Sequence, residues 1–535
     1  MTKPTTAFSN PTNLNRKHAA SLILLVAITL ALGLFRITAA EPHTDSPPVY
    51  TIIQRSWSEL LTDFFTPEGD VFGGIYPPFY FFLIKLYGGL IGSGLAQLRF
   101  FSVLALVGLV LLSWLAFPLI YKNSDERFRF LFALMVAVSP VHLWWAQTLK
   151  YPMWFYFVSA CSLTAAIWFI QEIDRRRLIL FSLSVAIVIY THYLGLVFSA
   201  ALFLVLGFII IFRRSKAWWQ QIVSSTLLVG ILISPLLLVL LKSVPSLVNT
   251  GYHFKAGFSL SKLIRAILVD WGFGYGLIPG HNLFAKLAAF SNALISRNWP
   301  DAVSIFQDGV GIALAATIVL GLNLAFTGYH LKRGPSLRVN STILLGVPLL
   351  TFGVSQITNL NFFPLHFGII AWGLLAFIVI GWVQSKHPIL PFVLGICMLV
   401  VNGISLNHYY ANLENKYPGK QLIIDYLNTH QPEFETAFVD DWITHVRGPA
   451  ITPDELHPDI ILLGFDSMAN IPLGQVDETG TIVFLAGTWE TIQAELEAVQ
   501  ATHSNFSWQL LETWPSLELA ERSIHVVEVT YTAAD

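Results

Sequence analysis

Charged residues are scarce in this chain of 535 residues. Only 12% of them are Asp, Glu, Lys or Arg, and 54% are hydrophobic, whereas an ordinary soluble domain has roughly 25% charged residues. Cysteine is also rare. Cys161 and Cys397 both lie inside apolar runs, so they indicate buried thiols rather than a disulfide framework or a metal motif. The low charge excludes a simple cytosolic enzyme.

The hydrophobic residues are gathered into long stretches. Several approach the roughly 20 residues that cross a bilayer, and they recur along the first three quarters of the chain. Residues 413–535 instead carry 20 of the 33 acidic residues and 4 of the 31 basic ones, so the net charge is +14 before residue 413 and -16 after it. A basic apolar body followed by an acidic tail of ordinary composition predicts two domains in two environments.

The basic clusters predict the topology by the positive-inside rule. Residues 1–18 end in a basic cluster and are expected in the cytoplasm; a signal peptide cleaved near residue 40 is the alternative, but the many later spans favour a retained first helix. The run at 78–92 begins with "YPPFYFF" and contains Lys85 and several glycines. We interpret it as an interfacial or re-entrant helix rather than a span. The eleven predicted spans lie near 19–38, 98–120, 128–144, 153–170, 178–192, 195–212, 219–241, 306–329, 341–358, 364–383 and 388–406.

This topology predicts a multi-pass protein of the plasma (inner) membrane. The membrane domain covers 19–407, and its first extracytoplasmic loop covers 39–97. An extracytoplasmic α/β domain is expected over 408–535, because "ETAFVDD", "DIILLGF", "TIVFLAG" and "SIHVVEVTY" are typical of strands and alternate with helical stretches. The tail has no glycine-rich phosphate loop, no HExxH and no Cys/His ligand spacing. It is therefore expected to support a membrane site rather than to perform chemistry.

Several ionisable residues are expected on the extracytoplasmic face. Glu41 and Asp45 follow the first helix by a few residues, and from the residues alone they are most simply solvated loop acids. Lys150 precedes Pro152 and a new span, so it either neutralises a phosphate or reaches the interface with its charge. His192 lies between two tyrosines at a helix end, where a packed interfacial histidine is the commoner case. Ionisable residues at a membrane boundary are nevertheless functional candidates.

Five stretches in order resemble the GT-C superfamily of integral-membrane glycosyltransferases. The resemblance is to the bacterial relatives of protein O-mannosyltransferases and of the lipid A aminoarabinose transferase (glycosyltransferase family 39-like). The stretches are "HTDSPP" with Asp45, "YPPFYFFLIKLYGGLIG", "QLRFFSVLALVGLV" with Arg99, "SPVHLWWAQTLKYPMW" and "YTHYLGLVF". The match covers roughly residues 30–250 in order and spacing, and beyond that it is mainly topological. It implies a GT-C-like fold of about 11 transmembrane helices with juxtamembrane helices.

The resemblance implies a transfer of one sugar from a polyprenyl phosphate to a lipid, glycan or protein acceptor. Asp45 would be the base, with Glu41 as a substitute, because the usual Asp-Glu pair reads "DS" here. Other expected roles follow the matching positions. The donor phosphate would be bound by Arg99, Lys150, His192 and Lys255, and the substrates by Tyr76, Gln147, Tyr193 and His366.

Three departures from the family pattern leave alternatives open. Besides the single Asp45, Lys150 stands where an arginine is usual, which loses bidentate phosphate geometry, and "FFPLHF" with His366 stands where Arg-Tyr is usual. A catalytically degenerate relative that acts as a scaffold or binds partners is therefore the alternative function. No cofactor is implied; a divalent metal on Glu41 and Asp45 is a minority interpretation. A transporter is disfavoured because the spans have almost no charge at mid-bilayer, and no nucleic-acid partner is expected.

Overall fold

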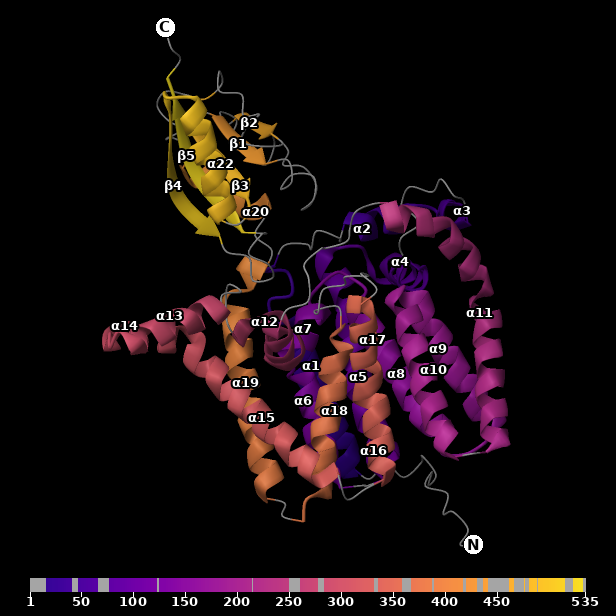
Figure 1. The fold of residues 1–535 in the computed structure, drawn as a ribbon. Coiled ribbons are helices and arrows are strands. Elements are labelled where there is room, and N and C mark those ends of the chain that lie inside the picture. The colour runs from indigo at the N-terminus through magenta and orange to yellow at the C-terminus, as the bar shows by residue number, and fades with distance from the viewer. Residues whose placement is uncertain are drawn as a thin grey trace.

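The computed structural model describes most of the chain. The described residues are 16–40, 47–65, 77–122, 125–213, 215–249, 260–277, 283–331, 335–357, 367–386, 389–416, 420–430, 436–440, 461–465, 476, 481–487, 489–514 and 523–532. They form a helical bundle with a separate α/β unit at one end (Figure 1). We call that end of the bundle the domain side; the first helix begins at the opposite end.

The bundle is built mainly from long apolar helices, with a few short ones between them. Its helices are α1 (Arg16–Leu34), α5 (Leu95–Tyr121), α6 (Glu126–Ala137), α7 (Pro140–Ala146), α8 (Pro152–Phe169), α9 (Arg175–Thr191), α10 (Leu194–Arg213), α11 (Lys216–Asn249), α15 (Gly311–Leu331), α16 (Pro335–Ser341), α17 (Val347–Ile357), α18 (Ile369–Gln384) and α19 (Ile389–Ala411). Shorter helices lie at the domain side: α2 (Pro47–Gln54), α3 (Trp57–Phe65), α4 (Phe79–Ile91), α12 (Leu260–Arg265), α13 (Leu283–Ile295) and α14 (Trp299–Ile305).

The protein is a polytopic α-helical membrane protein, as the hydrophobic runs predict. Eight described helices are long and apolar enough to cross a membrane, or nine if the bent pair α6 and α7 forms one span. Helices α9 and α18 are shorter but run through the bundle with the others (Figure 1). Each of the eleven predicted spans coincides with one of these helices or with a broken helix.

Contacts at both ends of α1 show its direction. The His18 side chain contacts that of Glu126 at the opposite end, whereas Arg99 at the start of α5 donates a 2.6 Å hydrogen bond to the Ile37 carbonyl just after α1. The chain between Ile37 and Arg99 therefore begins and ends at the domain side. Within it, α4 has 13 residues, about 20 Å of helix, against about 30 Å for a bilayer core. This confirms the expectation of a juxtamembrane helix at 78–92.

One predicted span is broken. The run at 128–144 forms α6 and α7, which meet at an angle of 50°. The break falls at Ser139 and Pro140, because proline has no backbone N–H to continue the ladder of α6 and is suited to the first position of a new helix. As a result, α7 bends away from the axis of α6 and forms part of the domain side.

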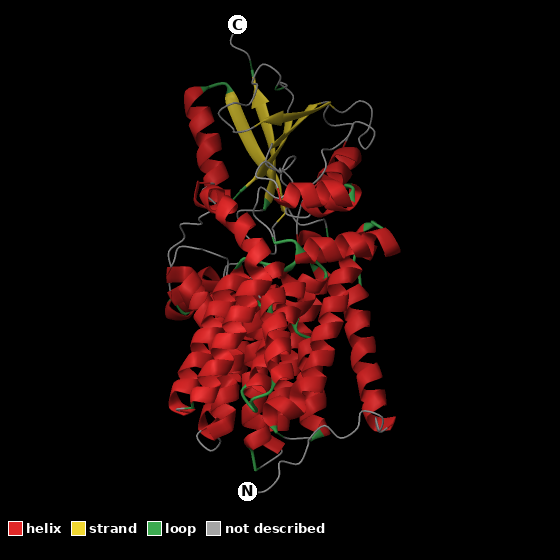
Figure 2. Cartoon of the chain, turned by 90° about the vertical axis from the view of Figure 1, so that its right-hand side faces the viewer, coloured by secondary structure: helices red, strands yellow, loops and turns green. Residues whose placement is uncertain are grey.

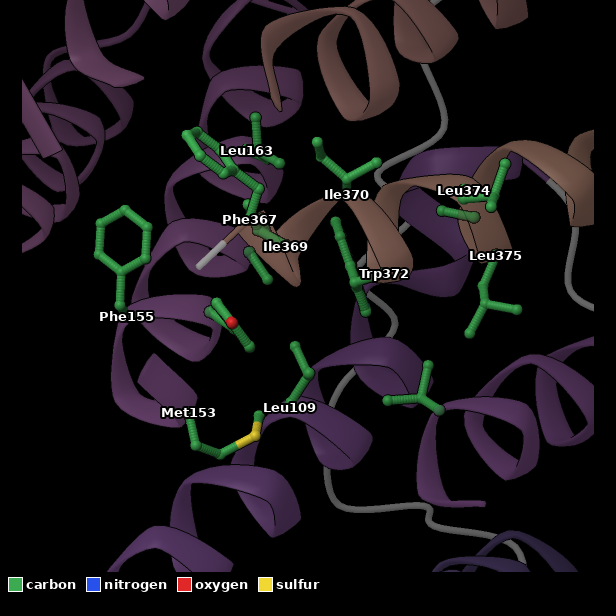
Figure 3. Close-up of a cluster of buried hydrophobic side chains, with 14 of the residues drawn as sticks. Leu109, Met153, Phe155, Leu163, Phe367, Ile369, Ile370, Trp372, Leu374 and Leu375 are labelled. Atoms are coloured by element: carbon green, nitrogen blue, oxygen red, sulfur yellow. The ribbon is translucent and has the colours of Figure 1, made fainter. Parts of the chain in front are cut away.

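The core of the bundle lies between α5, α8 and α18. Figure 3 shows Leu109 of α5, Met153, Phe155 and Leu163 of α8, and Ile369, Ile370 and Trp372 of α18 facing one another. The indole of Trp372 also donates a 2.9 Å hydrogen bond to Ser113 of α5, which satisfies two buried polar groups at once. The first, the middle and the last parts of the membrane domain are thus joined in one apolar core.

The tail forms a five-stranded sheet with helices on both faces (Figure 2). Its elements are α20 (Lys420–His430), β1 (Thr436–Asp440), β2 (Ile461–Phe465), β3 (Thr481–Ala486), α22 (Trp489–Thr502), β4 (Phe506–Trp514) and β5 (Ile524–Tyr531). The strand order is β2-β1-β3-β5-β4, with β1 parallel to β2 and β3 and with β5 antiparallel to β3 and β4. The predicted small, partly parallel α/β domain is confirmed. Strand β4 was not predicted, because its polar and apolar residues do not form a β-branched run.

Candidate active site

The described candidate residues lie together at the domain side of the bundle. Arg99 is on the first turns of α5, Gln147 ends α7, Lys150 lies in the loop from α7 to α8, and His192 and Tyr193 join α9 to α10. The remaining candidates, Glu41, Asp45, Tyr76, Lys255 and His366, lie outside the described residues. The loop between α7 and α8 is the centre of the described site.

Gln147 ties the end of α1 to this loop. Its side-chain nitrogen donates hydrogen bonds to the carbonyls of Leu32, Gly33 and Phe35, at 3.3, 3.1 and 2.8 Å. The last carbonyls of a helix have no partner inside it, so Gln147 acts as a cap for α1. Tyr410 reinforces this contact, because its hydroxyl donates a 2.6 Å hydrogen bond to the Leu32 carbonyl. Gln147 is therefore a positioning residue for the start of the first loop.

Arg99 is completely buried. Its guanidinium donates to the Ile37 carbonyl, and one turn later Ser102 donates a 3.1 Å hydrogen bond to the Thr148 carbonyl. The first two turns of α5 thereby hold both the segment after α1 and the loop after α7.

Lys150 lies among aromatic rings. Its ammonium group is 6.0 Å from the ring centroid of Trp145 and 5.7 Å from that of Tyr151, and the residue is 6% exposed. The ring of Tyr151 stacks on His192 with 4.3 Å between centroids. Tyr193 is half-buried beside them, 6.5 Å from the His192 ring. Lys150 and His192 are therefore neighbours, although they are far apart in sequence.

His192 is neutral at pH 7. Its burial, helped by the positive charge of Lys150, lowers the pKa of the imidazole to about 3. Nδ1 accepts a 3.1 Å hydrogen bond from the Leu194 backbone N–H, so the proton of the neutral ring is on Nε2. At this position His192 can donate a hydrogen bond but adds no charge.

Lys416 also lies among the candidate residues, although the sequence analysis did not single it out. It lies just beyond α19, is fully buried, and donates to the Trp144 carbonyl at 2.7 Å, to Thr148 Oγ1 at 2.9 Å and to the Tyr409 hydroxyl at 3.1 Å. Its ammonium group is also 4.3 Å from the centroid of the Trp144 ring. The only available signal was a lone lysine shortly after the last span, at the start of an acidic tail.

The segment 270–277 ("DWGFGYGL") packs closely against α7 and α19. A Cβ on Gly276 would lie 1.9 Å from the Ser405 carbonyl, and one on Gly274 (φ 76°) would lie 2.6 Å from Pro140 Cβ. Two hydrogen bonds fix the contact, from Ser405 Oγ to the Phe273 carbonyl and between His408 Nδ1 and the Gly276 carbonyl. Because glycine has no Cβ, Gly274 and Gly276 allow the backbone of this segment to approach α7 and α19 closely.

Asp270 is the buried acid of the described residues. It accepts a 2.7 Å hydrogen bond from Tyr275, whose ring lies 4.7 Å from that of Trp144. Burial raises the pKa of its carboxyl to about 6, against the opposing effects of Arg265 and of this hydrogen bond. The sequence signal was an acid in the apolar run "RAILVDWGFGYG". Asp270 thus holds Tyr275 beside Trp144, the ring next to the ammonium group of Lys416.

The described part of the site is therefore rich in positive charge. Arg99, Lys150 and Lys416 are buried there, against the single buried acid Asp270. Among the described residues, no group of three or more His, Cys, Asp or Glu is placed to hold a metal ion. Buried cations attract an anion such as a phosphate, since the attraction between charges is strong in a medium of low dielectric constant.

The fold is similar to those of solved membrane glycosyltransferases. The Archaeoglobus fulgidus oligosaccharyltransferase with a tethered acceptor peptide is 12% identical, covers 83% of this chain and has a TM-score of 0.48. ArnT from Cupriavidus metallidurans bound to undecaprenyl phosphate is 13% identical, with 95% of this chain and 98% of that chain covered and a TM-score of 0.40. The mycobacterial arabinofuranosyltransferase AftD is 12% identical over 98% of this chain, with a TM-score of 0.49.

The chain spans 65% of the length of the oligosaccharyltransferase and 40% of that of AftD. No family model matches the chain, and no curated protein matches its sequence. At identities of 12–13% the likeness describes the path of the chain, and the chemistry has to be judged from the residues of the site.

Proposed function

We propose that this protein is a glycosyltransferase that moves one sugar from a polyprenyl-phosphate donor to a lipid, glycan or protein acceptor on the extracytoplasmic face. The observation that carries the proposal is the convergence of Arg99, Lys150 and Lys416 at one end of a membrane-spanning bundle. A polyprenyl phosphate has an anionic head group and a long apolar tail. A buried cationic cluster next to lipid-exposed helices fits both parts.

The reaction requires a base that takes the proton of the acceptor and cations that stabilise the negative charge of the departing phosphate. The acceptor O–H loses its proton to a carboxylate, its oxygen forms a bond to the anomeric carbon, and the bond from that carbon to the phosphate oxygen breaks. The phosphate then leaves with the bonding electron pair. We assign the base to Asp45, with Glu41 as the alternative, and the stabilisation of the departing phosphate to Arg99 and Lys150.

Other residues are assigned to binding. His192 is neutral, so it would orient the phosphate by a hydrogen bond rather than by charge. Tyr193 lies beside His192, and we keep it with Tyr76 and His366 as a substrate contact and Lys255 as a phosphate ligand. Gln147, whose side chain is engaged by the end of α1 and by Tyr409, is assigned to positioning the start of the first loop.

The test is a transfer assay with purified protein, after mass spectrometry of the lipids that co-purify with it. We expect a polyprenyl phosphate or its sugar conjugate among them. Asp45→Asn keeps the shape but removes the proton acceptor, so transfer should fall by about 10² to 10⁴-fold while the donor lipid still binds. Lys150→Ala should weaken donor binding together with the rate, because it removes a charge partner from both the ground state and the transition state.

Asp301→Asn is the matched control, because Asp301 is an exposed acid of α14. If Glu41→Gln abolishes transfer and Asp45→Asn does not, the base is Glu41. If neither variant matters while the wild type turns over, the acid-base mechanism is wrong. A protein that binds no polyprenyl lipid and transfers none of the polyprenyl-phosphate sugars supplied would instead be the scaffold of the alternative function.

A further inference from the structure

Helices α13 and α14 form a hairpin that projects sideways from the bundle at the domain side (Figure 1). We call residues 283–306 the arm. The hairpin is well formed: Asn298 donates its backbone N–H to the Ala293 carbonyl at 2.9 Å, and Ala293 and Ala302 are buried between the two helices. The turn between the helices contains Arg297, a non-glycine residue with φ of 57°. The arm is therefore a defined structure rather than an irregular loop.

Large apolar side chains of the arm are exposed. Ile295 is 81% exposed, Trp299 61%, Val303 53% and Phe306 46%. Trp299, Val303 and Phe306 are spaced i, i+4 and i+7, which places them on one face of the helix. Asp301 and Ser304 are exposed and lie on the opposite face. The arm is thus amphipathic. Phe306 packs on Phe290 of α13 with 5.9 Å between ring centroids, and the rest of its ring, Trp299 and Val303 stay exposed.

This apolar face continues into the lipid-facing surface of the bundle. The chain passes from α14 through the π-helical segment η3 (Phe306–Val310) into the span α15, whose Leu314, Ile318 and Leu322 are exposed at intervals of four residues. Gly309 has a φ of 109° in the bend, a conformation that favours glycine. The exposed apolar face of the arm is therefore continuous along the chain with the exposed apolar face of α15.

We infer that the arm is a membrane-interface anchor, with Trp299, Val303 and Phe306 inserted between the lipid head groups of the leaflet at the domain side. Three observations support this: the continuity with α15, the orientation across the bundle axis in Figure 1, and the polar opposite face. Amphipathic helices of this kind lie in the plane of the interface with their apolar face about 5–10 Å deep, and tryptophan favours this layer. The inference does not depend on the proposed reaction.

The test places an environment-sensitive fluorophore on each face of α14. Val303→Cys and Ser304→Cys are made separately in the full chain with Cys161→Ser and Cys397→Ala, labelled, and reconstituted into phosphatidylcholine vesicles. Ile318→Cys on α15 is the control for a lipid-facing position. We expect the label at 303 to resemble that at 318, with blue-shifted emission, quenching by lipids that carry a nitroxide, and several-fold weaker quenching by iodide than at 304.

Two results would overturn the inference. Equal quenching by iodide at 303 and 304 would place the arm in water. Protection at 303 without quenching by nitroxide lipids, lost as the protein is diluted in lipid, would show that a second copy of this chain covers the face. If the cysteine-free background does not fold, the pair is measured with both native cysteines present, and the signal of labelled wild type is subtracted.

Discussion

The hydroxyl of Tyr409 donates a 2.8 Å hydrogen bond to Gln147 Oε1, although 262 residues separate the two in sequence. Gln147 caps α1, and Tyr409 accepts a hydrogen bond from Lys416. The end of the first span, the loop after α7 and the exit from the last span are therefore joined by one buried polar chain. Buried networks of this kind are costly to interrupt.

Tyr409→Phe is expected to loosen this network. The substitution removes one partner from both Gln147 and Lys416, and loss of a buried hydrogen bond costs roughly 1–3 kcal/mol. The apparent melting temperature in detergent should fall, and the rate of transfer should fall with it. Tyr329→Phe is the control, because Tyr329 is 61% exposed on α15. An unchanged melting temperature for Tyr409→Phe would contradict the network.

Lys416→Met is expected to weaken donor binding. The change keeps a long side chain but removes the charge and three hydrogen bonds. These hydrogen bonds lie within the protein, so their loss should lower the melting temperature. Loss of the buried positive charge should separately weaken donor binding, about 10-fold for each 1.4 kcal/mol of attraction removed. Binding is measured by titration with a polyprenyl phosphate, with Lys122→Met at the opposite end as the control. A lower melting temperature with unchanged affinity would show that Lys416 is purely structural.

Asp270→Asn is expected to stabilise the protein at neutral pH. The folded-state pKa of Asp270 is about 6, above its ordinary value of 3.8, so the unfolded chain binds fewer protons between these values. Stability therefore falls as pH rises from about 4 to about 6, by roughly 3 kcal/mol in all. Asn removes this penalty and keeps an acceptor for Tyr275. The variant should melt higher than wild type at pH 7.5, with the difference shrinking toward pH 4.5; a constant difference would contradict the assignment.

Gly276→Ala is expected to be strongly destabilising. Its Cβ would lie 1.9 Å from the Ser405 carbonyl, so the backbone of segment 270–277 or of α19 has to move. Gly403→Ala on α19 is the matched control, since nothing lies within 4 Å of its Cβ and alanine favours helix. The melting temperature should fall for the first variant and stay level or rise slightly for the second. Equal behaviour would show that the close contact is absent.

Labelling of intact cells tests the orientation. Ser507 on β4 and Arg127 on α6 are exposed and lie at opposite ends of the molecule. A membrane-impermeant maleimide should react with Ser507→Cys and not with Arg127→Cys, because the basic clusters place the end near Arg127 in the cytoplasm. The reverse pattern would invert the topology, and reaction at both positions would contradict the number of crossings.

The sequence alone determined the parts of this protein that depend on local patterns. Long apolar runs are sufficient to specify spans, because every buried backbone group in lipid must be satisfied within a helix. Alternating strands and helices likewise identified the α/β unit. The motifs predicted Arg99, Gln147, Lys150 and His192 as site candidates, and the structure places these four at one end of the bundle. The break at Pro140 fell inside a run that reads as one span, because composition does not record the angle between two helices.

Only the tertiary structure decided which distant residues meet. Lys416 and Tyr409 belong to the exit from the last span, and nothing near them in sequence indicates that they contact Trp144 and Gln147. The sequence also does not predict the close approach of Gly276 to Ser405 or the exposure of Val303 on the arm. Each of these properties depends on how segments far apart in the sequence pack against each other. That packing is set by the whole core rather than by either segment.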